Sequence, residues 1–519
     1  MIFLFFVLFI IVIIIKIGYN IFNYTKRSNF VKLSEIMKGI TYTGLIKDDV
    51  EITDIIYDSR KAHDGTVFVC LSGLKLDGHK FARGAYDNGA RVFIAEKEIS
   101  LPCDAQVLIV ENSRAALGLM SAEFFSHPAK ELKIIGITGT KGKTTTAHLV
   151  QKILNESGIP CGIIGTVGAE FGGVKYPTEN TTPESYELQK LFRQMLERGC
   201  KAVAVEVSSL GVKHGRVDGI RFCAGVFTNL SPDHIGPLEH DDLSEYAYWK
   251  SVLFERCDTA VMNYDDEAHT IMSKNCKCRI ISYGVDSSCD IYAKNIEAVR
   301  NTDMMGISFD CFAFSKEYKI TAPIPGTFNV YNILAALGAA FAAGCPLEHA
   351  AQALKSIKIR GRAEIVDIDA PFDVIIDYAH NGLSLKSIIE TLYTYKTGRI
   401  ICVFGSVGGR TQERRREMGL VAGSMCELCV LTADNPDFED PMSVINDIAQ
   451  AVKEAGGQYY AEPDRRKAIE YALSAAREGD LILLAGKGHE NYQLINGKKE
   501  PFSELECIEE YMRRKSNND

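Results

Sequence analysis

Positive charge, tryptophan and repeated segments are all scarce in this chain of 519 residues. Lys and Arg total 58 against 67 Asp and Glu, whereas a nucleic-acid-binding protein usually carries a basic excess. The sequence has no internal repeat and no low-complexity tract, and its 46% hydrophobic content is that of an ordinary globular protein. The 15 cysteines show no disulfide-framework spacing. These observations exclude nucleic acid as an expected partner and favour reduced thiols in a cytoplasmic location.

The length predicts several domains rather than one. Changes in the residue pattern divide the chain into a hydrophobic amino-terminal segment (1–28), an amino-terminal domain (29–130), a central domain (131–358) and a carboxyl-terminal domain (359–519). Apolar strands alternate with helical segments through the last two domains. This alternation is typical of α/β proteins whose parallel sheets carry helices on both faces.

The amino-terminal segment predicts a hydrophobic helix that anchors the protein to a membrane. Residues 1–15 contain no polar side chain, and apolar residues continue to Phe22 with interruptions at Lys16 and Asn20. About 20 apolar residues span a bilayer. Basic residues follow the segment and none precedes it, which places the rest of the chain on the cytoplasmic side. An interfacial helix or a wrongly chosen start codon is the alternative.

A glycine-rich segment, Gly139-Thr-Lys-Gly-Lys-Thr-Thr-Thr146, separates a predicted strand (132–138) from a predicted helix (144–156). Backbone amides of such a loop bind phosphate oxygens, the lysine reaches the outer phosphates, and the following hydroxyl can bind Mg²⁺. Position 137 is Ile, where the strict pattern has Gly. The segment therefore predicts a nucleoside triphosphate site made of Gly139, Thr140, Lys141, Gly142, Lys143, Thr144 and Thr145.

Acidic and basic side chains follow two more predicted strands (202–207 and 224–228). Glu206 closes the first strand and His234 follows the second, so both are expected at the carboxyl edge of the sheet, where ligands bind. A carboxylate beside a phosphate loop suits Mg²⁺. Taken singly, His234 is more typical of a capping or core histidine, and Lys250 of a solvated helix lysine.

Seven further motifs occur in a fixed order between about residues 50 and 505, and together with the phosphate loop they resemble the Mur ligase family of peptidoglycan synthesis. They are Glu206-Val-Ser-Ser209, Thr228-Asn-Leu-Ser-Pro-Asp-His-Ile-Gly236, Gly326-Thr-Phe-Asn329, Gly361-Arg362, Asp377-Tyr-Ala-His380, Asp434-Asn-Pro436 and Gly486-Lys-Gly-His-Glu490. The resemblance implies a three-domain fold with a UDP-substrate-binding domain, a central P-loop ATP-binding domain and a Rossmann-like amino-acid-binding domain.

The resemblance also implies an ATP-dependent ligase that acts as a monomer. In that reaction the glutamate carboxylate of UDP-N-acetylmuramoyl-L-alanyl-D-glutamate becomes an acyl phosphate, which a free amino acid then attacks, so that the third amino acid is added. The motifs match the branch of the family that carries out this step.

Site roles come from the resemblance residue by residue. The catalytic set is Lys143, Glu206, His234 and Lys250, with Lys250 as a carbamate derived from CO₂. The Mg²⁺ ligands are Thr144, Glu206, His234 and the Lys250 carbamate. ATP also contacts Asn329, Arg362 and Asp377. The UDP-linked substrate contacts Ser59, Asn180, Thr181, Thr182, Ser208 and Arg216. The incoming amino acid contacts Arg415, Asp434, Asn435, Asp437, Gly486 and Glu490.

The identity of the added amino acid depends on Asp437. Family members that add meso-diaminopimelate carry Arg directly after Asp-Asn-Pro, and that Arg pairs with the distal carboxylate of the amino acid. Asp437 would repel this carboxylate and attract the side-chain ammonium of lysine or ornithine. Lys141, Gly236-Pro-Leu-Glu-His240 and Asp377-Tyr-Ala-His-Asn-Gly382 also resemble the lysine-adding members of the family. We therefore expect L-lysine, with diaminopimelate as the alternative if Asp437 points to solvent.

Three other functions compete with this interpretation. A folylpolyglutamate synthase resembles the last two domains and lacks the first. A Mur-like amidating subunit carries a four-cysteine zinc ribbon, whereas Cys276 and Cys278 are separated by a single residue and have no second pair. A catalytically inactive, membrane-tethered scaffold would not need the intact set of Lys143, Glu206 and Lys250.

Overall fold

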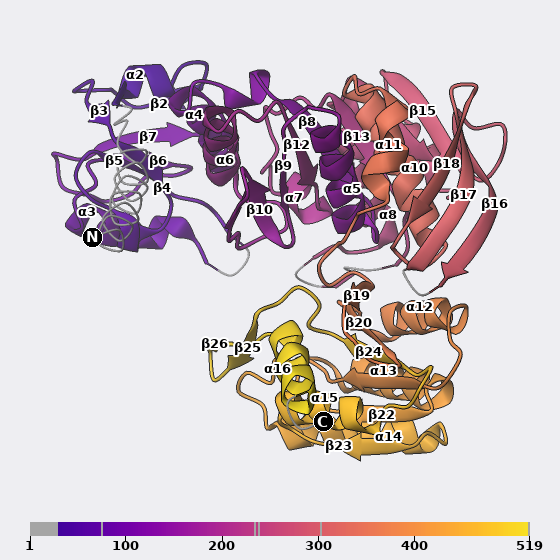
Figure 1. The fold of residues 1–519 in the computed structure, drawn as a ribbon. Coiled ribbons are helices and arrows are strands. Elements are labelled where there is room, and N and C mark those ends of the chain that lie inside the picture. The colour runs from indigo at the N-terminus through magenta and orange to yellow at the C-terminus, as the bar shows by residue number, and fades with distance from the viewer. Residues whose placement is uncertain (1–29, 74–75, 233–234, 237–238, 302–303, 517–519) are drawn as a thin grey trace, which may run out of the picture. The chain divides into compact units, whose positions relative to one another are not determined.

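The computed structural model describes residues 30–73, 76–232, 235–236, 239–301 and 304–516 (Figure 1). The predicted membrane anchor (1–28) and the candidate metal ligand His234 lie outside these ranges. Among the residues that are described, no helix combines the length and apolarity that crossing a membrane requires. The amino-terminal anchor thus has no support from the structure and stays a prediction.

The described residues form two compact units. The first contains the residues up to Leu132 together with Pro183–Glu197 and Gly211–Ile220, and the second contains the remainder. The first unit therefore includes two segments that the sequence pattern assigns to the central domain.

A five-stranded sheet lies at the centre of the first unit, with the order β2-β7-β6-β5-β4 among the described strands. Strands β4 to β7 are parallel, and β2 runs antiparallel to β7. Val67 and Val69 pack in one apolar cluster while Phe68 packs in another, so both faces of the sheet are covered. The elements are β1 (Val31–Lys32), α2 (Leu33–Ile36), β2 (Tyr42–Thr43), β3 (Glu51–Ile52), β4 (Asp54–Ile56), η1 (Ser59–Lys61), β5 (Thr66–Val69), η2 (Gly78–Phe81), α3 (Ala82–Asp87), β6 (Val92–Ala95), β7 (Gln106–Val110), α4 (Ser113–Phe124), η3 (Pro128–Lys130) and α6 (Ser185–Glu197).

The larger sheet of the second unit has eleven described strands in the order β11-β10-β9-β12-β8-β13-β14-β15-β16-β17-β18. Strands β9, β12, β8, β13, β14, β15 and β16 form parallel pairs with their neighbours, and antiparallel strands complete both ends. The strands are β8 (Lys133–Thr138), β9 (Cys161–Gly165), β10 (Gly168–Phe171), β11 (Val174–Tyr176), β12 (Ala202–Glu206), β13 (Ala224–Phe227), β14 (Thr259–Asn263), β15 (Arg279–Gly284), β16 (Ile291–Arg300), β17 (Met305–Ala313) and β18 (Lys316–Ala322).

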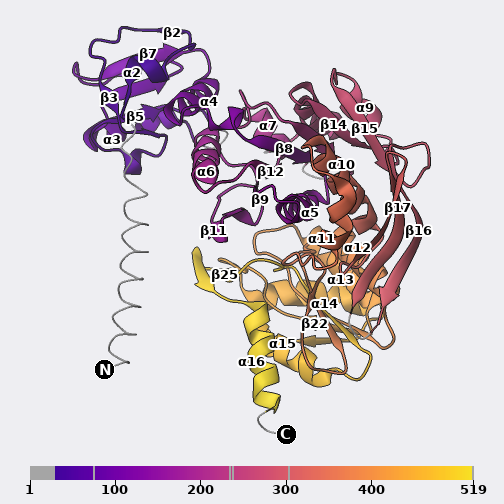
Figure 2. The same ribbon diagram turned by 45° about the horizontal axis from the view of Figure 1, so that its top comes forward.

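Two helices, α5 (Lys143–Glu156) and α10 (Phe328–Ala342), pack against this sheet and against each other (Figure 2). Both are rich in buried apolar residues, and they contribute to one core cluster with strands β8, β9 and β12 to β18. The remaining helices are α7 (Ser209–Lys213), α8 (Leu243–Ser251), η4 (Val252–Glu255), α9 (His269–Ser273), η5 (Leu347–His349) and α11 (Ala350–Leu354). Strand β8 lies between β12 and β13 and is parallel to both, so the carboxyl ends of the three strands lie at the same edge of the sheet.

A second sheet in the same unit has the described order β19-β20-β24-β21-β22-β23, parallel except for β19. Ile401 and Val403 belong to one apolar cluster, and Ile400, Cys402 and Phe404 belong to the other. The elements are β19 (Glu364–Val366), β20 (Asp373–Asp377), α12 (Gly382–Tyr393), β21 (Ile400–Phe404), α13 (Gln412–Met425), β22 (Leu428–Leu431), α14 (Pro441–Glu454), β23 (Tyr459–Ala461), α15 (Arg465–Ala475), β24 (Leu481–Ala485), β25 (Tyr492–Ile495), β26 (Lys498–Pro501) and α16 (Glu504–Ser516). Helices α12 to α14 cover one face and α15 and α16 the other, so this sheet has the predicted α/β architecture.

We expect Leu334→Ala to destabilise the core beside the large sheet. Leu334 is fully buried on α10, and truncation of a buried leucine costs about 2–5 kcal/mol of unfolding free energy. Trp249 is the single tryptophan, so its fluorescence during denaturant unfolding reports on this part of the chain. Ile271→Ala, on the exposed surface of α9, should change the midpoint little. Equal shifts in the two variants would contradict the assignment of this core.

Candidate active site

The phosphate loop lies where the carboxyl end of β8 meets the amino terminus of α5. Gly139 has a φ of +145° and Gly142 a φ of +84°, backbone conformations that favour glycine. A Cβ at Gly139 would lie 2.0 Å from Thr228 Oγ1, and one at Gly142 would lie 2.4 Å from Asn332 Oδ1. Both glycines are therefore required by close packing as well as by their backbone conformation.

The loop is attached to the residues that follow β13. Thr140 N donates to Asn229 O at 2.8 Å, and Lys141 N donates to Asn229 Oδ1 at 2.9 Å. Thr228 Oγ1 donates to Lys141 O at 2.6 Å. Lys143 Nζ donates to the loop's own carbonyls, Gly139 O at 2.8 Å and Thr140 O at 3.0 Å. The lysine amine thus lies within the loop at the start of α5, where a phosphate chain is bound in loops of this kind.

Glu206 joins the loop helix to the neighbouring strand end. Its side chain is buried, and Oε2 accepts hydrogen bonds from Thr144 Oγ1 and Thr166 Oγ1, both at 3.0 Å, while Oε1 accepts from Thr166 N at 3.0 Å. A hydroxyl and a carboxylate are hard oxygen ligands of the type that Mg²⁺ prefers. The donor set of Thr144 and Glu206 therefore fits the predicted metal, while His234 cannot be placed.

Lys250 lies under the same loop. Its side chain is 1% exposed, and Nζ donates to Gly139 O at 2.9 Å. The amine also lies 4.2 Å from the centre of the Tyr246 ring. Taken singly, Lys250 was expected to be a solvated helix lysine. That expectation is wrong, because the side chain is buried and its amine donates to the same carbonyl, Gly139 O, as the amine of Lys143. Its conversion to a carbamate stays a prediction.

A cavity of about 690 Å³ opens beside the loop, within the size range of ligand pockets. Its lining includes the predicted ATP contacts Lys141, Gly142, Thr145, Asn329, Arg362 and Asp377. Asn329 is held by Pro325 O and Asn332, and Asp377 accepts from the amides of residues 363 and 379. Burial raises the pKa of Asp377, and the nearby Arg362 opposes this shift. The structure therefore brings most of the predicted nucleotide residues to one cavity.

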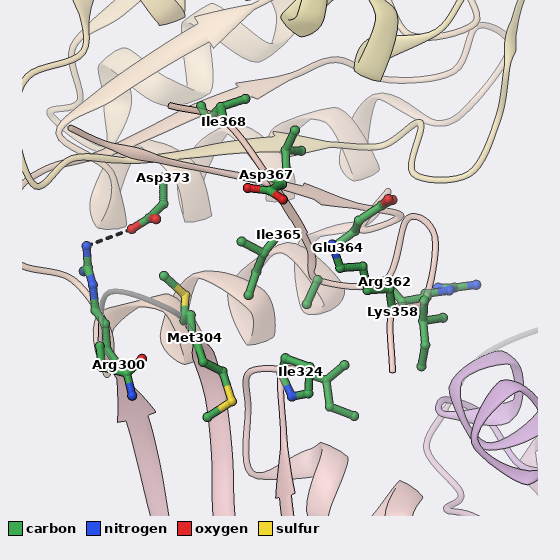
Figure 3. Close-up of a pocket in the computed structure, with 16 residues that line it drawn as sticks. Arg300, Met304, Ile324, Lys358, Arg362, Glu364, Ile365, Asp367, Ile368 and Asp373 are labelled. Carbon is green, nitrogen blue, oxygen red and sulfur yellow. Dashed lines mark hydrogen bonds and ion pairs between the residues drawn. The ribbon is translucent and has the colours of Figure 1, made fainter. Parts of the chain in front are cut away.

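A second cavity, of about 250 Å³, shares Arg362 and Ala363 with the first (Figure 3). Figure 3 shows the ion pair of Arg300 and Asp373, whose nitrogen and oxygen are 2.8 Å apart, together with the apolar side chains Met304 and Ile324. The phosphate loop does not contribute to its lining. The predicted nucleotide site therefore corresponds to the larger of these two cavities.

The predicted contacts of the UDP-linked substrate fall in both units. In the second unit Thr182 Oγ1 donates to Glu206 O at 2.9 Å and lies 3.1 Å from Ser208 Oγ, and Thr181 Oγ1 lies 3.1 Å from Thr166 Oγ1. Asn180 is exposed in the same segment. In the first unit Ser59 begins η1, and Arg216 Nε donates to Glu184 Oε1 at 2.9 Å. Thr182 and Ser208 are thus connected by hydrogen bonds to the backbone carbonyl of Glu206, and Thr181 is connected through Thr166 to its carboxylate, the predicted metal ligand.

Predicted amino-acid contacts meet at the carboxyl ends of β22 and β24. Asn435 Nδ2 donates to Glu490 Oε2 at 2.9 Å, and the buried Lys487 Nζ donates to Asn435 Oδ1 at 2.8 Å and to Glu490 Oε2 at 2.7 Å. Asp434 is 2% exposed, and its Oδ1 accepts no hydrogen bond from the described residues. A Cβ at Gly486 would lie 2.7 Å from Asp434 Oδ2. This edge therefore presents an anionic oxygen suited to an ammonium group.

Two of the predicted amino-acid contacts have other partners. Arg415 forms ion pairs with Glu439 at 2.6 Å and with Asp447 at 2.9 Å, which already engage its guanidinium. Asp437 has a φ of +52°, and its Oδ1 accepts a hydrogen bond from Gly497 N at 2.7 Å in the turn between β25 and β26. The Asp437 carboxylate thus holds a hairpin turn, and the inference of lysine from its charge loses its basis.

Two histidines flank Tyr378 next to these residues. The ring centres of His380 and His489 lie 4.8 and 4.7 Å from that of Tyr378, and Arg362 lies over the same ring. Burial lowers the pKa of both histidines to about 4. Both imidazoles are therefore neutral at neutral pH and add no positive charge to the site.

Several residues of the site escape sequence reasoning. Thr166 follows β9 without a motif of its own, and Lys487 lies inside the Gly-Lys-Gly-His-Glu motif, which gives no sign that its amine is buried. Cys257, far from Cys276 in sequence, has its sulfur 3.5 Å from that of Cys278, which is 3.2 Å from that of Cys276. Only the folded chain shows these neighbours.

The sequence was compared with known proteins. The family descriptions "Mur ligase family, catalytic domain", "Mur ligase middle domain" and "Mur ligase, glutamate ligase domain" match residues 51–125, 137–340 and 361–488. Two UDP-N-acetylmuramoyl-L-alanyl-D-glutamate–2,6-diaminopimelate ligases are each 38% identical to this chain. That of Clostridium botulinum aligns over 93% of this chain and 100% of its own, and that of Caldanaerobacter subterraneus over 93% and 99%. A solved structure of a ligase with this name has a TM-score of 0.67 at 28% identity and covers 94% of this chain and 99% of its own.

We expect Gly139→Ala to weaken ATP binding by about tenfold or more, because the new Cβ would meet Thr228 Oγ1 at 2.0 Å and distort the loop. Gly158→Ala is the matched control: Gly158 also has a positive φ, of +77°, but nothing lies within 4 Å of its Cβ position. Alanine strains the backbone at both positions, by about 1–2 kcal/mol at the left-handed φ of Gly158, so the control reports backbone strain without the clash. Calorimetric titration with Mg-ATP would measure the difference, and equal affinities for the two variants would contradict the packing argument.

Proposed function

The chain belongs to the Mur ligase family, and from this membership we propose that it is the ATP-dependent ligase that adds the third amino acid to UDP-N-acetylmuramoyl-L-alanyl-D-glutamate. One observation carries the proposal: the phosphate loop and the buried Glu206 lie at one sheet edge, beside a cavity lined by predicted nucleotide contacts. The aligned relatives span all three domains, which disfavours a folylpolyglutamate synthase.

The proposed chemistry proceeds in two transfers. A carboxylate oxygen of the substrate glutamate attacks the terminal phosphorus of ATP, and ADP leaves. The amine of the incoming amino acid then attacks the acyl carbon, phosphate leaves, and the amine loses a proton. Lys143 would neutralise the transferred phosphoryl group. Thr144 and Glu206 would hold Mg²⁺, which supplies charge neutralisation to the phosphates when it is bound.

For the third amino acid, we infer 2,6-diaminopimelate ahead of L-lysine. The relatives that align over nearly the whole chain carry diaminopimelate in their names. Asp437, the main residue that favoured lysine, is engaged with the backbone of Gly497. Lysine remains the second candidate because the position after Asp-Asn-Pro lacks the Arg that would pair with a distal carboxylate.

The purified wild-type protein should release phosphate only when ATP, the UDP-linked dipeptide and an amino acid are all present, and turnover should be faster with diaminopimelate than with lysine. Lys143→Ala should lower the rate by about 100-fold or more, because the charge opposite the transferred phosphoryl group is lost. Lys152→Ala, on the same helix, should be neutral because Lys152 pairs only with Glu156 among the contacts described.

Two results would contradict this proposal. Faster turnover with lysine would reverse the choice of amino acid and leave the ligase intact. Phosphate release from ATP that does not depend on the dipeptide or the amino acid would instead favour the inactive scaffold. The absence of any release from folded protein would favour it as well.

We expect Asp437→Asn to leave the preference between diaminopimelate and lysine within about twofold, because asparagine tolerates the left-handed backbone and keeps an oxygen that can accept from Gly497 N. Asp434→Asn is the contrasting variant and should weaken the binding of both amino acids, since the buried Asp434 Oδ1 accepts no hydrogen bond from the described residues. A tenfold shift toward diaminopimelate in Asp437→Asn would show that the Asp437 charge selects the amino acid after all.

A further inference from the structure

An arginine buried under the amino-acid loops has no role in the chemistry described above. Arg465 is the first residue of α15, and its side chain is 1% exposed. Its guanidinium donates to Glu504 Oε1 from Nε at 3.0 Å and from Nη2 at 2.7 Å. It also donates from Nη1 to Ala433 O at 3.2 Å and from Nη2 to Ala485 O at 3.0 Å. Three segments therefore depend on one side chain.

The positions of the two carbonyls show which loops Arg465 connects. Ala433 directly precedes Asp434, and Ala485 directly precedes Gly486. These alanines lie at the ends of β22 and β24, which are not neighbours, because β21 lies between them in the sheet. Strand β21 is paired with both strands and sets their spacing within the sheet, whereas beyond the strand ends a planar guanidinium bonded to both carbonyls links the two loops directly.

Charge provides a second link between Arg465 and the site. Burial raises the pKa of Asp434, and the positive charge of Arg465, followed by that of Lys487, opposes this shift. Asp434 Oδ1 has no hydrogen-bond donor among the described residues, so nearby positive charge is its main compensation. The ionised form of Asp434 is the form that attracts an ammonium group.

We propose that Arg465 is a positioning residue that fixes the spacing of the Asp434 and Gly486 loops, so that it controls affinity for the incoming amino acid. This inference rests on the proposed function, since it assumes that the two loops bind that amino acid. Arg465 itself touches neither ATP nor the reacting atoms in this scheme. Removal of the Arg465 guanidinium should therefore raise the KM for the amino acid and leave the KM for ATP little changed.

A second ion pair at the opposite edge of the same sheet serves as a control, with a buried acid and an arginine side chain that is 30% exposed. Arg399 directly precedes β21, and Asp480 directly precedes β24. Arg399 pairs with Asp480 at 2.6 Å and donates to Ala475 O at 2.9 Å. This ion pair resembles that of Arg465 and Glu504 but contacts no residue next to the predicted amino-acid contacts. Arg399→Met therefore reports the general effect of losing such a pair.

The test compares Arg465→Met, Arg465→Lys, Arg399→Met and the double variant Arg465→Met with Glu504→Leu. The double variant removes both charges, which often restores the stability lost when one partner of a buried pair is deleted. For each protein, Tm and the KM values for ATP, the UDP-linked dipeptide and the amino acid are measured. We expect the amino-acid KM to rise tenfold or more in Arg465→Met and to stay high in the double variant even where Tm recovers. The KM for ATP should stay within twofold throughout.

Arg465→Lys should fall between wild type and Arg465→Met, because lysine keeps the charge but cannot bond both carbonyls in one plane. Recovery of the amino-acid KM together with Tm in the double variant would overturn the proposal, since it would show a purely structural role. A comparable rise in Arg399→Met would overturn it as well. Wild-type protein that ligates neither amino acid would overturn the proposed function and this inference together. If the wild type is active, the variants test the role of Arg465 alone.

Discussion

The buried carboxylate of Glu206 is the contact on which the nucleotide site depends. A carboxylate without hydrogen-bond partners costs several kcal/mol to bury, so its donors must be held in place. They come from Thr144 at the start of the loop helix and from Thr166 after β9. The strand order β9-β12-β8-β13 brings these segments to one edge, and the site follows from that order. The same edge binds ligands in open α/β sheets generally.

Two sites of the second unit are built by different means. The phosphate loop is held by backbone and side-chain bonds to Thr228 and Asn229, on the adjacent strand end. The amino-acid loops follow strands that are not adjacent, and buried charged side chains, Lys487 and Arg465, hold them instead. The first arrangement tolerates little change because it depends on glycines in close contact. The second depends on charge and is sensitive to the loss of a single cation.

The parts of the fold that could be predicted are those with continuous apolar runs. The predicted strands at 132–138, 202–207 and 224–228 match β8, β12 and β13 to within one residue at each end, and the loop helix begins within one residue of its expected start. The antiparallel strands β16 to β18 were not predicted, because charged side chains such as Lys294 and Glu297 interrupt their apolar pattern. A buried arginine at the start of a helix looks like any solvated one in a sequence, so Arg465 gave no signal.

The interpretation of Asp437 shows why a residue type at a motif position is weak evidence. Its charge suggested selection of an ammonium group, but its left-handed backbone and its bond to Gly497 are set by a hairpin 60 residues further along the chain. The sequence offered no means of seeing this pairing. Membership of the family was far more secure than the choice of amino acid, because the first rested on many ordered motifs and the second mainly on the charge of one side chain.

Gly165, the last residue of β9, has an implication for how this site can change over time. A Cβ there would lie 2.1 Å from Glu206 Oε1, closer than any non-bonded contact allows. The constraint acts in one direction: a side chain at 165 would displace the Glu206 carboxylate, and it would become acceptable only in a lineage that had already shortened or lost the acid. Replacement of that glycine in a related sequence would thus be a mark of a chain that has abandoned this form of phosphate chemistry.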